Sequence, residues 1–511
     1  MISKAMTCAL SGIDGVIVTI EADCSQGLPS MEIVGLPDTA VKEAKERVRS
    51  AILNSELIFP QKRVVVNLAP AYIRKEGSAF DLPITMAILA STGQVDLRLI
   101  EEYIFIGELA LDGSVRGVNG VLPMVLEARK RGFKKAIVPY DNSKEASVVN
   151  GIEVYGAKTL SHVMYHLRGD KEIEPTKVDL ENIFSGVPDI YGDFADVKGQ
   201  EVAKRALTIA AAGGHNVLMI GSPGSGKTML AKRLPTIMPD MTFEEALEIT
   251  KIYSISGKLP NDTPLITARP FRNPHHTVSA VAITGGGTNP KPGEICLAHR
   301  GVLFLDEFPE FRKDTIDAMR QPLEDGRFTV SRANAAVTFP SDVMLVASMN
   351  PCKCGYFGDT SRECKCSAGE IQRYMRKISG PMLDRIDIHI QVPSIKYSEL
   401  SEKRKTTSSA DMKKAVDEAR KIQAERYKKE RYISNSALNN KGLEKYCQLD
   451  KKSKLLLGEV FQKLGLSARA YTRILKVART IADIEGSENI SVKHVAEAVQ
   501  YRSLDKKFWF N

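Results

Sequence analysis

The chain has 511 residues, of which 43% are hydrophobic and 26% are charged, and its formal net charge is +9. That length exceeds what one hydrophobic core organises, so we expect two to four domains of ordinary soluble composition. The modest positive charge permits nucleic-acid binding without requiring it, and eight cysteines in so long a chain do not suggest a disulfide framework.

One uncharged run, Ala206–Gly226, approaches the length of a membrane span. It contains Gly213, Gly214 and Pro223 and leads into a glycine-rich turn, so we interpret it as a helix end, a buried strand and a turn. The first residues lack the apolar core and small-residue cleavage site of a secretory signal. We therefore expect a cytoplasmic protein without membrane contact.

Residues 1–168 alternate short β-branched runs with helical stretches. The runs VIVTIEAD, RVVVNLAP and KKAIVPY are typical of strands, whereas TAVKEAKERVRSAIL is typical of a helix. This pattern predicts an α+β or α/β domain. The polar, proline-containing segment 169–189 has no sustained periodicity and is predicted to be a linker.

Residues 190–395 open with a strand, a glycine-rich loop and a helix, and continue with strands at VLFLDE, VMLVASMN and DIHIQV. This order predicts a parallel α/β nucleotide-binding core. The loop matches G-x-x-x-x-G-K-[ST], whose glycines let backbone N–H groups surround phosphates. We expect Lys227 to reach the β- and γ-phosphates of ATP and the Thr228 hydroxyl to hold magnesium. The motif consists of Gly221, Ser222, Pro223, Gly224, Ser225, Gly226, Lys227 and Thr228.

Two carboxylates follow the apolar run VLFL. Asp306 is placed to hold magnesium through water, and Glu307 is placed to polarise the attacking water as the general base. Such a pair is a weak signal by itself, but it becomes specific together with the phosphate loop earlier in the chain. His275 and His276, in a glycine-rich insertion, are expected to be polar loop or pore-facing residues that could contact phosphate.

Three more residues follow in the order of an ATPase site. Asn350 ends the run VMLVASMN, where its amide could orient the water or sense the γ-phosphate. Arg385 is either an arginine finger for a neighbouring subunit's ATP or half of a surface ion pair with Asp384 or Asp387. Arg469, in the C-terminal block, could report the nucleotide state to that block.

Four cysteines lie in a glycine-rich loop after Asn350. Cys352-x-Cys354 and Cys364-x-Cys366 supply four thiolates, which suit a closed tetrahedral zinc site, although C-x-C is tighter than the usual spacing. Four reduced thiols and a redox switch between cysteine pairs are the alternatives, and iron–sulfur is a weaker metal hypothesis. Nothing in the pattern indicates a catalytic metal.

The remaining segment, 396–511, contains no β-type runs. Basic and acidic residues alternate at helical spacing in DMKKAVDEARKIQAERYKKERY, and further helical patterns follow. This composition predicts a helical lid domain.

The motifs together resemble a known family. DFADVKGQEVAKRALTIAAAGGHNVLMIGSPGSGKT, PGEICLAHRGVLFLDEFPEF, ASMNPCKCG and SGPMLDRIDIHIQV are similar to the magnesium-chelatase-like AAA+ proteins, and within them to the ComM (YifB) family. The N-terminal block and SARAYTRILKVARTIAD in the lid also fit, so the resemblance covers nearly the whole chain.

The resemblance implies a homohexameric ring with ATP sites between subunits, and a DNA helicase that promotes branch migration in recombination during natural transformation. Branched or single-stranded DNA is the implied partner. The assignments made above for the ATP site match the family's positions, with Arg385 as the arginine finger and Arg469 as the second sensor.

The segment DGRFTVSRA resembles the hairpin that points into the central pore of related ring helicases. We therefore expect Arg327 and Arg332 to contact DNA. The alternative is that both arginines pair with acidic neighbours such as Glu324 and Asp325 on the same surface.

Residues 1–168 resemble the Lon-protease-like domain through KEGSAFDL and IGELALDGSVRGVNGVL. In that protease a serine near the first segment acts with a lysine near the second, because a neutral lysine can take the serine proton. Here the lysine position falls at about Leu122, so Ser78 is interpreted as a structural residue and no peptidase activity is expected.

Two other functions stay open. One is a chelatase-type motor subunit that helps a partner insert magnesium into a tetrapyrrole. The Lon-like block argues against it, because that motor's family normally lacks the block. The other is a protein-remodelling ATPase whose N-terminal domain binds peptide.

Overall fold

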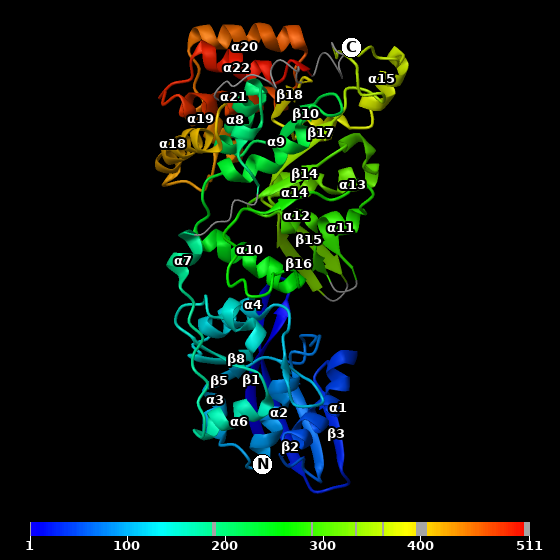
Figure 1. Cartoon of the computed structure of the whole chain (residues 1–511), viewed down its shortest axis with the longest axis vertical. Helices are drawn as coiled ribbons and strands as arrows, with labels where there is room; N and C mark the ends of the chain where they lie inside the picture. Colours follow the sequence, from blue (N-terminus) through cyan, green and yellow to red (C-terminus); the bar gives the residue numbers. More distant parts are fainter. Residues whose placement is uncertain are drawn as a thin grey trace. The chain divides into compact units, whose positions relative to one another are not determined.

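The computed structural model describes residues 2–185, 191–287, 290–332, 335–359, 362–394 and 406–504. The chain forms two compact units (Figure 1). The first comprises Met1–Val187, Phe243–Thr267 and Ser331–Thr338, and the second comprises Pro188–Thr242, Ala268–Val330 and Phe339–Asn511. The first break lies within the segment predicted as a linker. The first unit also includes two segments from the predicted ATPase core, while the rest of that core and the predicted lid share one unit.

The first unit is built on a mixed sheet with the strand order β3-β4-β2-β1-β5-β8-β9. Its strands are β1 (Ile2–Ser11), β2 (Asp14–Ser25), β3 (Ser30–Val34), β4 (Arg63–Ala69), β5 (Tyr103–Phe105), β8 (Lys135–Pro139) and β9 (Glu153–Ala157). β1 and β2 form an antiparallel hairpin, β4 pairs antiparallel with β2, and the other neighbours are parallel. A small separate sheet joins β6 (Glu108–Leu109) and β7 (Val115–Arg116).

The first unit also contains helices, several of which pack apolar residues against the sheet. They are α1 (Thr39–Asn54), α2 (Asp81–Ser91), α3 (Leu97–Glu101), α4 (Val121–Lys130), α5 (Ser143–Ala146), α6 (Leu160–Arg168), α7 (Leu180–Ser185) and α10 (Phe243–Ser256). α1 begins at Asp38, whose carboxylate accepts from the Val41 N–H and satisfies a helix-end donor. α2 is buried along nearly its whole length because its sequence, DLPITMAILAS, is apolar on all sides.

The second unit has a parallel sheet with the order β11-β14-β17-β10-β18. The strands are β10 (Val217–Ile220), β11 (Phe271–Arg272), β14 (Val302–Leu305), β17 (Met344–Met349) and β18 (Ile388–Gln391). β10, β14 and β17 are continuous buried apolar runs, as expected for parallel strands covered on both faces. The first strand of this sheet in chain order, β10, lies between the last two, β17 and β18, so polar residues that follow β10, β14 and β17 gather at one edge of the sheet.

The second unit also contains short helices and hairpins. The helices are α8 (Glu201–Gly213), α9 (Lys227–Arg233), α11 (Ala280–Thr284), α12 (Glu294–Leu297), α13 (Lys313–Ala318), α14 (Arg320–Asp325), α15 (Ala368–Met375) and α16 (Gly380–Leu383). One hairpin joins β12 (Gly285–Gly286) to β13 (Lys291–Pro292). A second joins β15 (Arg327–Arg332) to β16 (Ala335–Pro340), and its segment Ser331–Thr338 belongs to the first unit.

The C-terminal region is helical and shares a core with the sheet. Its helices are α18 (Ser409–Tyr427), α19 (Asn440–Tyr446), α20 (Lys451–Leu464), α21 (Ala468–Ile484) and α22 (Val492–Gln500). α18 starts with a capping box formed by Ser408 and Asp411. α18 and α21 pack on α8, and their apolar residues join those of β10 and β18 in one buried cluster. The α/β class, the parallel core and the helical C-terminal region are as predicted.

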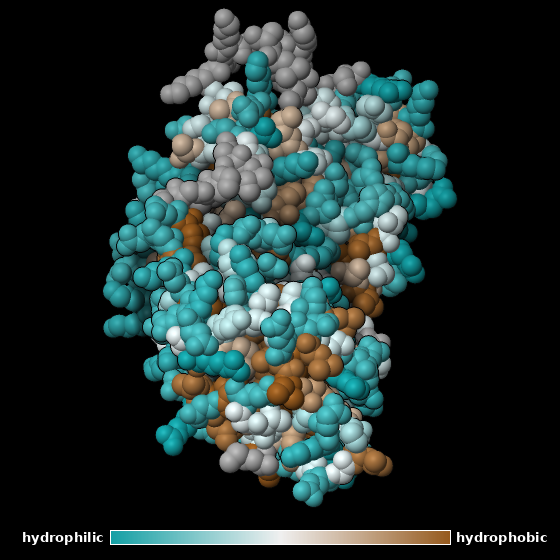
Figure 2. All heavy atoms as spheres, turned by 60° about the horizontal axis from the view of Figure 1, so that its bottom comes forward, coloured by the Kyte–Doolittle hydropathy of each residue, from teal (hydrophilic) through white to brown (hydrophobic). Residues whose placement is uncertain are grey.

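Hydrophilic side chains cover most of the face shown in Figure 2, with apolar side chains gathered in patches in its lower half. Exposed large apolar residues of the first unit include Leu28, Leu36 and Tyr72. Within the described part of the chain, no helix is both long and apolar enough to cross a membrane.

Candidate functional site

The phosphate loop joins the end of β10 to the start of α9. Gly224 and Gly226 have φ angles of +76° and +89°, a region that side chains rarely adopt. Gly221 is required for a different reason, since a Cβ there would come within 2.3 Å of the Val392 carbonyl oxygen. The loop therefore needs its glycines both for backbone conformation and for close contact with the segment after β18.

Lys227 is folded back onto the loop that precedes it. Its Nζ donates to the carbonyl oxygens of Gly221 at 2.7 Å and Ser222 at 3.0 Å. The same ammonium lies 3.4 Å from the Asn350 Oδ1, so the structure brings these two predicted residues together. Burial lowers the pKa of Lys227, which is the expected effect of a desolvated ammonium.

Asp306 is the centre of a hydroxyl and carboxylate cluster at the same sheet edge. Its Oδ2 accepts from the Thr228 Oγ1 at 2.9 Å, and its Oδ1 accepts from the Glu307 N–H at 3.0 Å and from the Ser348 hydroxyl. Hydroxyl and carboxylate oxygens are ligands that Mg²⁺ prefers, so the donor set fits magnesium. Ser348 was missed by sequence reasoning. The available signal was its position on β17, two residues before Asn350 and therefore on the same side of the strand.

Glu307 directly follows Asp306 and is largely exposed. Its φ of +51° is unusual for a residue with a side chain. The His276 Nδ1 lies 3.4 Å from the Glu307 Oε2, and the ring of His276 packs against that of His275 with centroids 4.1 Å apart. The paired histidines were expected to be polar loop or pore-facing residues. Both histidines lie in a loop, and His276 lies beside the predicted general base.

Arg385 is mostly buried and held within its own chain. It donates to the carbonyl oxygens of Arg320 at 3.2 Å and Pro381 at 2.7 Å, and it forms an ion pair with Glu324. The sequence offered Asp384 or Asp387 as ion-pair partners, and the observed partner is neither.

Asp384 and Asp387 contact the lid helix α21 instead. Arg469 is 60% exposed and lies 3.9 Å from the Asp384 Oδ2. Asp387 is buried and forms an ion pair with Arg473, one turn further along α21. Burial opposes ionisation of Asp387, but Arg473 and then His215 hold the pKa of its carboxyl well below the usual range.

The hairpin β15–β16 carries the two arginines predicted to contact DNA. Arg327 is exposed at the start of β15, and no ion pair joins it to Glu324 or Asp325 in the described residues. The rings of Phe328 and Phe339 stack at 5.4 Å and hold the two strands together. The side chain of Arg332 lies outside the described residues.

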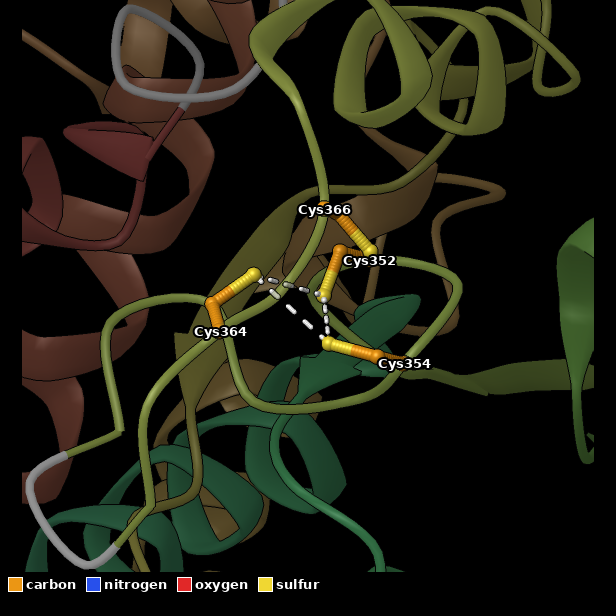
Figure 3. A group of neighbouring side chains, drawn as sticks. All are labelled: Cys352, Cys354, Cys364 and Cys366. Carbon is orange, nitrogen blue, oxygen red and sulfur yellow. Dashed lines mark hydrogen bonds between the residues drawn. The ribbon is translucent and has the colours of Figure 1, made fainter.

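The four predicted cysteine ligands converge in space (Figure 3). The Cys352 Sγ is 3.3 Å from the Cys354 Sγ and 3.7 Å from the Cys364 Sγ, and the last two sulfurs are 3.6 Å apart. With Cys366 included, all four sulfurs lie within 4.8 Å of one another, and all four thiols are free. Zinc–sulfur bonds of about 2.3 Å place tetrahedral ligands about 3.8 Å apart, so this cluster fits a zinc ion.

The thiols of this cluster differ in pKa. Backbone hydrogen bonding, first from Tyr356, lowers the pKa of the Cys354 thiol, whereas desolvation and hydrogen bonds with the neighbouring thiols outweigh the same backbone effect and raise the pKa of Cys364 and Cys366. The predicted iron–sulfur alternative needs more room than one ion, and the short sulfur separations favour a single metal.

In the first unit, the surroundings of Ser78 differ from those of a serine peptidase. The Ser78 hydroxyl donates to the Glu108 carboxylate, and Leu122 is fully buried. Lys75, near in sequence, is also buried, but its Nζ donates to the carbonyl oxygens of Gly35 at 3.0 Å and of Pro70. In the described residues the Ser78 hydroxyl is thus hydrogen-bonded to a carboxylate, and its structural role stays a prediction.

Comparison with known proteins assigns the class. Models of the magnesium chelatase subunit ChlI match residues 193–400 and 20–142, and a model of its C-terminal region matches residues 406–502. With the parallel sheet order and the residues at its carboxyl edge, these matches define a magnesium-chelatase-type AAA+ ATPase.

Relatives that match nearly the full length of this chain identify the family within that class. The chain is 45% identical to "Competence protein ComM" of Haemophilus influenzae, over 97% of this chain and 96% of the relative. It is 43% identical to "Uncharacterized protein YifB" of Escherichia coli, over 99% and 98% of the two chains. The chain belongs to the magnesium-chelatase ChlI-like family of ComM and YifB. A shorter match, 27% identical over 24% of this chain and 17% of the relative, is to the archaeal Lon protease of Methanocaldococcus jannaschii.

Proposed function

We propose that this AAA+ ATPase is a DNA translocase that promotes branch migration of recombination intermediates as a homohexameric ring. The observation that carries the proposal is the likeness to a competence protein over nearly the full length of both chains. Competence is the ability to take up DNA, and recombination follows uptake. The partner is branched or single-stranded DNA.

In this proposal each residue at the sheet edge has a separate task. Lys227 moves from the carbonyl oxygens of its own loop to the β- and γ-phosphates. Thr228 and Asp306 would hold magnesium, which supplies neutralisation of phosphate charge when bound. Glu307 accepts the proton of the attacking water, and the Asn350 amide orients that water.

His276 is the additional residue that the structure contributes to this set. The His276 imidazole, whose Nδ1 lies 3.4 Å from the Glu307 Oε2, holds that carboxylate in one direction. We infer that His276 is a positioning residue that controls when Glu307 faces the water.

Helix α14 contacts Arg385 and leads into the hairpin β15–β16, which we propose contacts DNA. Arg385 binds Glu324 and the Arg320 carbonyl oxygen, both on α14, and β15 begins two residues after α14 ends. An arginine that leaves Glu324 to reach a neighbour's ATP also releases the helix that leads into the hairpin. This arrangement supports a link between the nucleotide state and the position of Arg327 on DNA.

The four-cysteine cluster would bind a second metal ion besides magnesium. We infer that Cys352, Cys354, Cys364 and Cys366 bind one structural zinc ion per chain. A closed set of four thiolates leaves no open position for a substrate, so its role is structural.

The decisive experiment measures ATP turnover and displacement of labelled strands from four-way and forked DNA. We expect branched DNA to stimulate turnover of the wild-type protein and ATP to drive displacement. Glu307→Gln is the matched control, since it should bind both ligands but displace no strand. Wild-type protein that hydrolyses ATP but neither binds nor displaces branched DNA would overturn the proposal and leave the ATPase assignment intact.

A chelatase-type motor is the second candidate. All three matching family models describe the magnesium chelatase subunit, and one of them matches residues 20–142. The match at residues 20–142 weakens the expectation that the N-terminal block argues against this candidate. ATP turnover that is indifferent to every DNA structure but stimulated by a tetrapyrrole-binding partner would favour it.

A further inference from the structure

The loop that carries the cysteines lies directly against the phosphate loop. Gly355 packs on Pro223, because a Cβ at Gly355 would come within 2.6 Å of the Pro223 Cδ. The φ of Gly355 is +88°, which adds a conformational reason for glycine at this position. Pro223 is a rigid ring in the middle of the phosphate loop, so it cannot move aside as a flexible side chain would.

A second contact fixes the neighbouring residue of the phosphate loop. The Asp359 Oδ2 accepts from the hydroxyls of Ser222 and Ser394, the latter at 2.6 Å. Ser394 follows β18, so one carboxylate ties the cysteine loop to the phosphate loop and to the sheet. Ser222 in turn supplies a carbonyl oxygen to Lys227.

Both contact residues belong to the segment between the two cysteine pairs. Gly355 directly follows Cys354, and Asp359 lies five residues before Cys364. The described part of this segment has no helix or strand. Its internal contacts include two backbone turns, at Gly355 and Asp359, and the Arg362 guanidinium, which donates to the Tyr356 hydroxyl and lies over the Tyr356 ring. An irregular segment of this kind holds a fixed shape better when its ends are constrained.

We propose that zinc bound by the four cysteines holds this segment against Ser222 and Pro223 and thereby keeps the phosphate loop in its ATP-binding conformation. The zinc site then stabilises the nucleotide site as well as the long loop that carries the cysteines. Because coupling between two binding equilibria is reciprocal, zinc raises the affinity for ATP and bound ATP raises the affinity for zinc by the same factor. The inference rests on the ATPase assignment and not on the proposed DNA activity.

The first test measures zinc content and nucleotide affinity of the full chain. Elemental analysis should give about one zinc per chain, and removal of zinc with a chelator should weaken binding of a fluorescent ATP analogue about tenfold, a typical coupling strength. Zinc added back should restore affinity, and the analogue should lower the fraction of zinc that a competing colorimetric chelator removes at equilibrium. Native protein without zinc and with four freely titrating thiols would overturn the metal site.

Variants distinguish an effect of zinc on the phosphate loop from a general effect on folding. Asp359→Asn and Gly355→Ala should retain zinc and weaken nucleotide binding, whereas Cys364→Ser should lose zinc and weaken it as well. Cys24→Ser, at a half-buried cysteine of the first unit that contacts Ser91 at 3.0 Å, is the matched control and should change neither. Circular dichroism confirms that each variant is folded.

Two outcomes distinguish the possible failures. Full nucleotide affinity in zinc-free protein and in Asp359→Asn would show that the metal does not act on the phosphate loop. Full nucleotide affinity in Lys227→Ala would instead show that the nucleotide binds elsewhere, and would reject the ATP-site assignment on which the inference rests.

Discussion

Replacing Asp387 tests the connection between the nucleotide-binding sheet and the lid. Its carboxylate is 4% exposed and accepts from the Asn216 N–H at 3.2 Å, with the His215 Nδ1 at 3.4 Å and Arg473 as its ion-pair partner. Asp387→Asn leaves the Arg473 guanidinium without its counter-charge near a buried position. Loss of one partner from a buried ion pair costs about 3–5 kcal/mol.

Urea unfolding followed by far-ultraviolet circular dichroism measures this cost. With a slope of about 3 kcal/mol per M, the midpoint of the transition that reports the second unit should fall by about 1 M or more. Asp384→Asn is the matched control, because Asp384 lies 3.9 Å from the exposed Arg469 and such a pair contributes less than about 1 kcal/mol. Equal midpoints for wild type and Asp387→Asn would refute the reasoning.

The same variant has a defined pH dependence. The pKa of Asp387 is lower in the folded protein than the unfolded value of about 3.9, so the unfolded state binds the proton more readily. The stabilisation is therefore complete at neutral pH and is lost as pH falls below about 5 towards the folded pKa. The stability difference between wild type and Asp387→Asn should shrink over that range, and a difference that grows on acidification would contradict the sign.

Four further predictions concern the ATP and DNA sites. Lys227→Ala should abolish nucleotide binding, whereas Glu307→Gln should bind ATP tightly and lower turnover at least about 100-fold, as measured by filter binding and phosphate release. Arg385→Ala should lose about 1,000-fold in turnover if it acts in trans, and mixing it with Lys227→Ala subunits should restore some activity. No rescue in mixed rings confirmed by mass would count against that role. His276→Ala should lower kcat with unchanged affinity for ATP, and an unchanged kcat would show that His276 does not position Glu307. Arg332→Ala should retain basal turnover but reduce DNA stimulation and the slope of DNA affinity against salt, whereas wild-type values for both would place the contact elsewhere.

The local motifs were predictable because their residues are adjacent in sequence and their chemistry needs that spacing. The phosphate loop, with its lysine and threonine, lies between a strand and a helix as predicted, and Asp306 directly follows the next buried strand in the chain, β14. The parallel sheet brings Asp306 and Thr228 to within hydrogen-bond distance of each other. The clustering of the four cysteines was predictable from their number and from the loop that they share.

The partners of these residues were not predictable, since they come from distant parts of the chain. Ser348 has the appearance of an ordinary strand residue until the sheet order places it beside Asp306. Arg385 has acidic neighbours in sequence, but the backbone turns it towards Glu324, 61 residues away. The contact of His276 with Glu307 depends on how the intervening insertion folds, for which the sequence carries no periodic signal.

The division of the chain into units has a consequence for deletion experiments. The backbone passes from one unit to the other at residues 187, 242, 267, 330 and 338, so no single cut separates them. α10, which is encoded after the phosphate loop, packs on α4, and the Gly120 N–H donates to the Ser254 carbonyl oxygen at 3.1 Å. A truncation that removes residues 1–187 strips α10 of these neighbours and leaves its apolar side chains without cover. A loss of activity in such a truncated protein would therefore report misfolding near the ATPase core as much as the missing N-terminal function, and point substitutions on the N-terminal surface are the sound genetic approach.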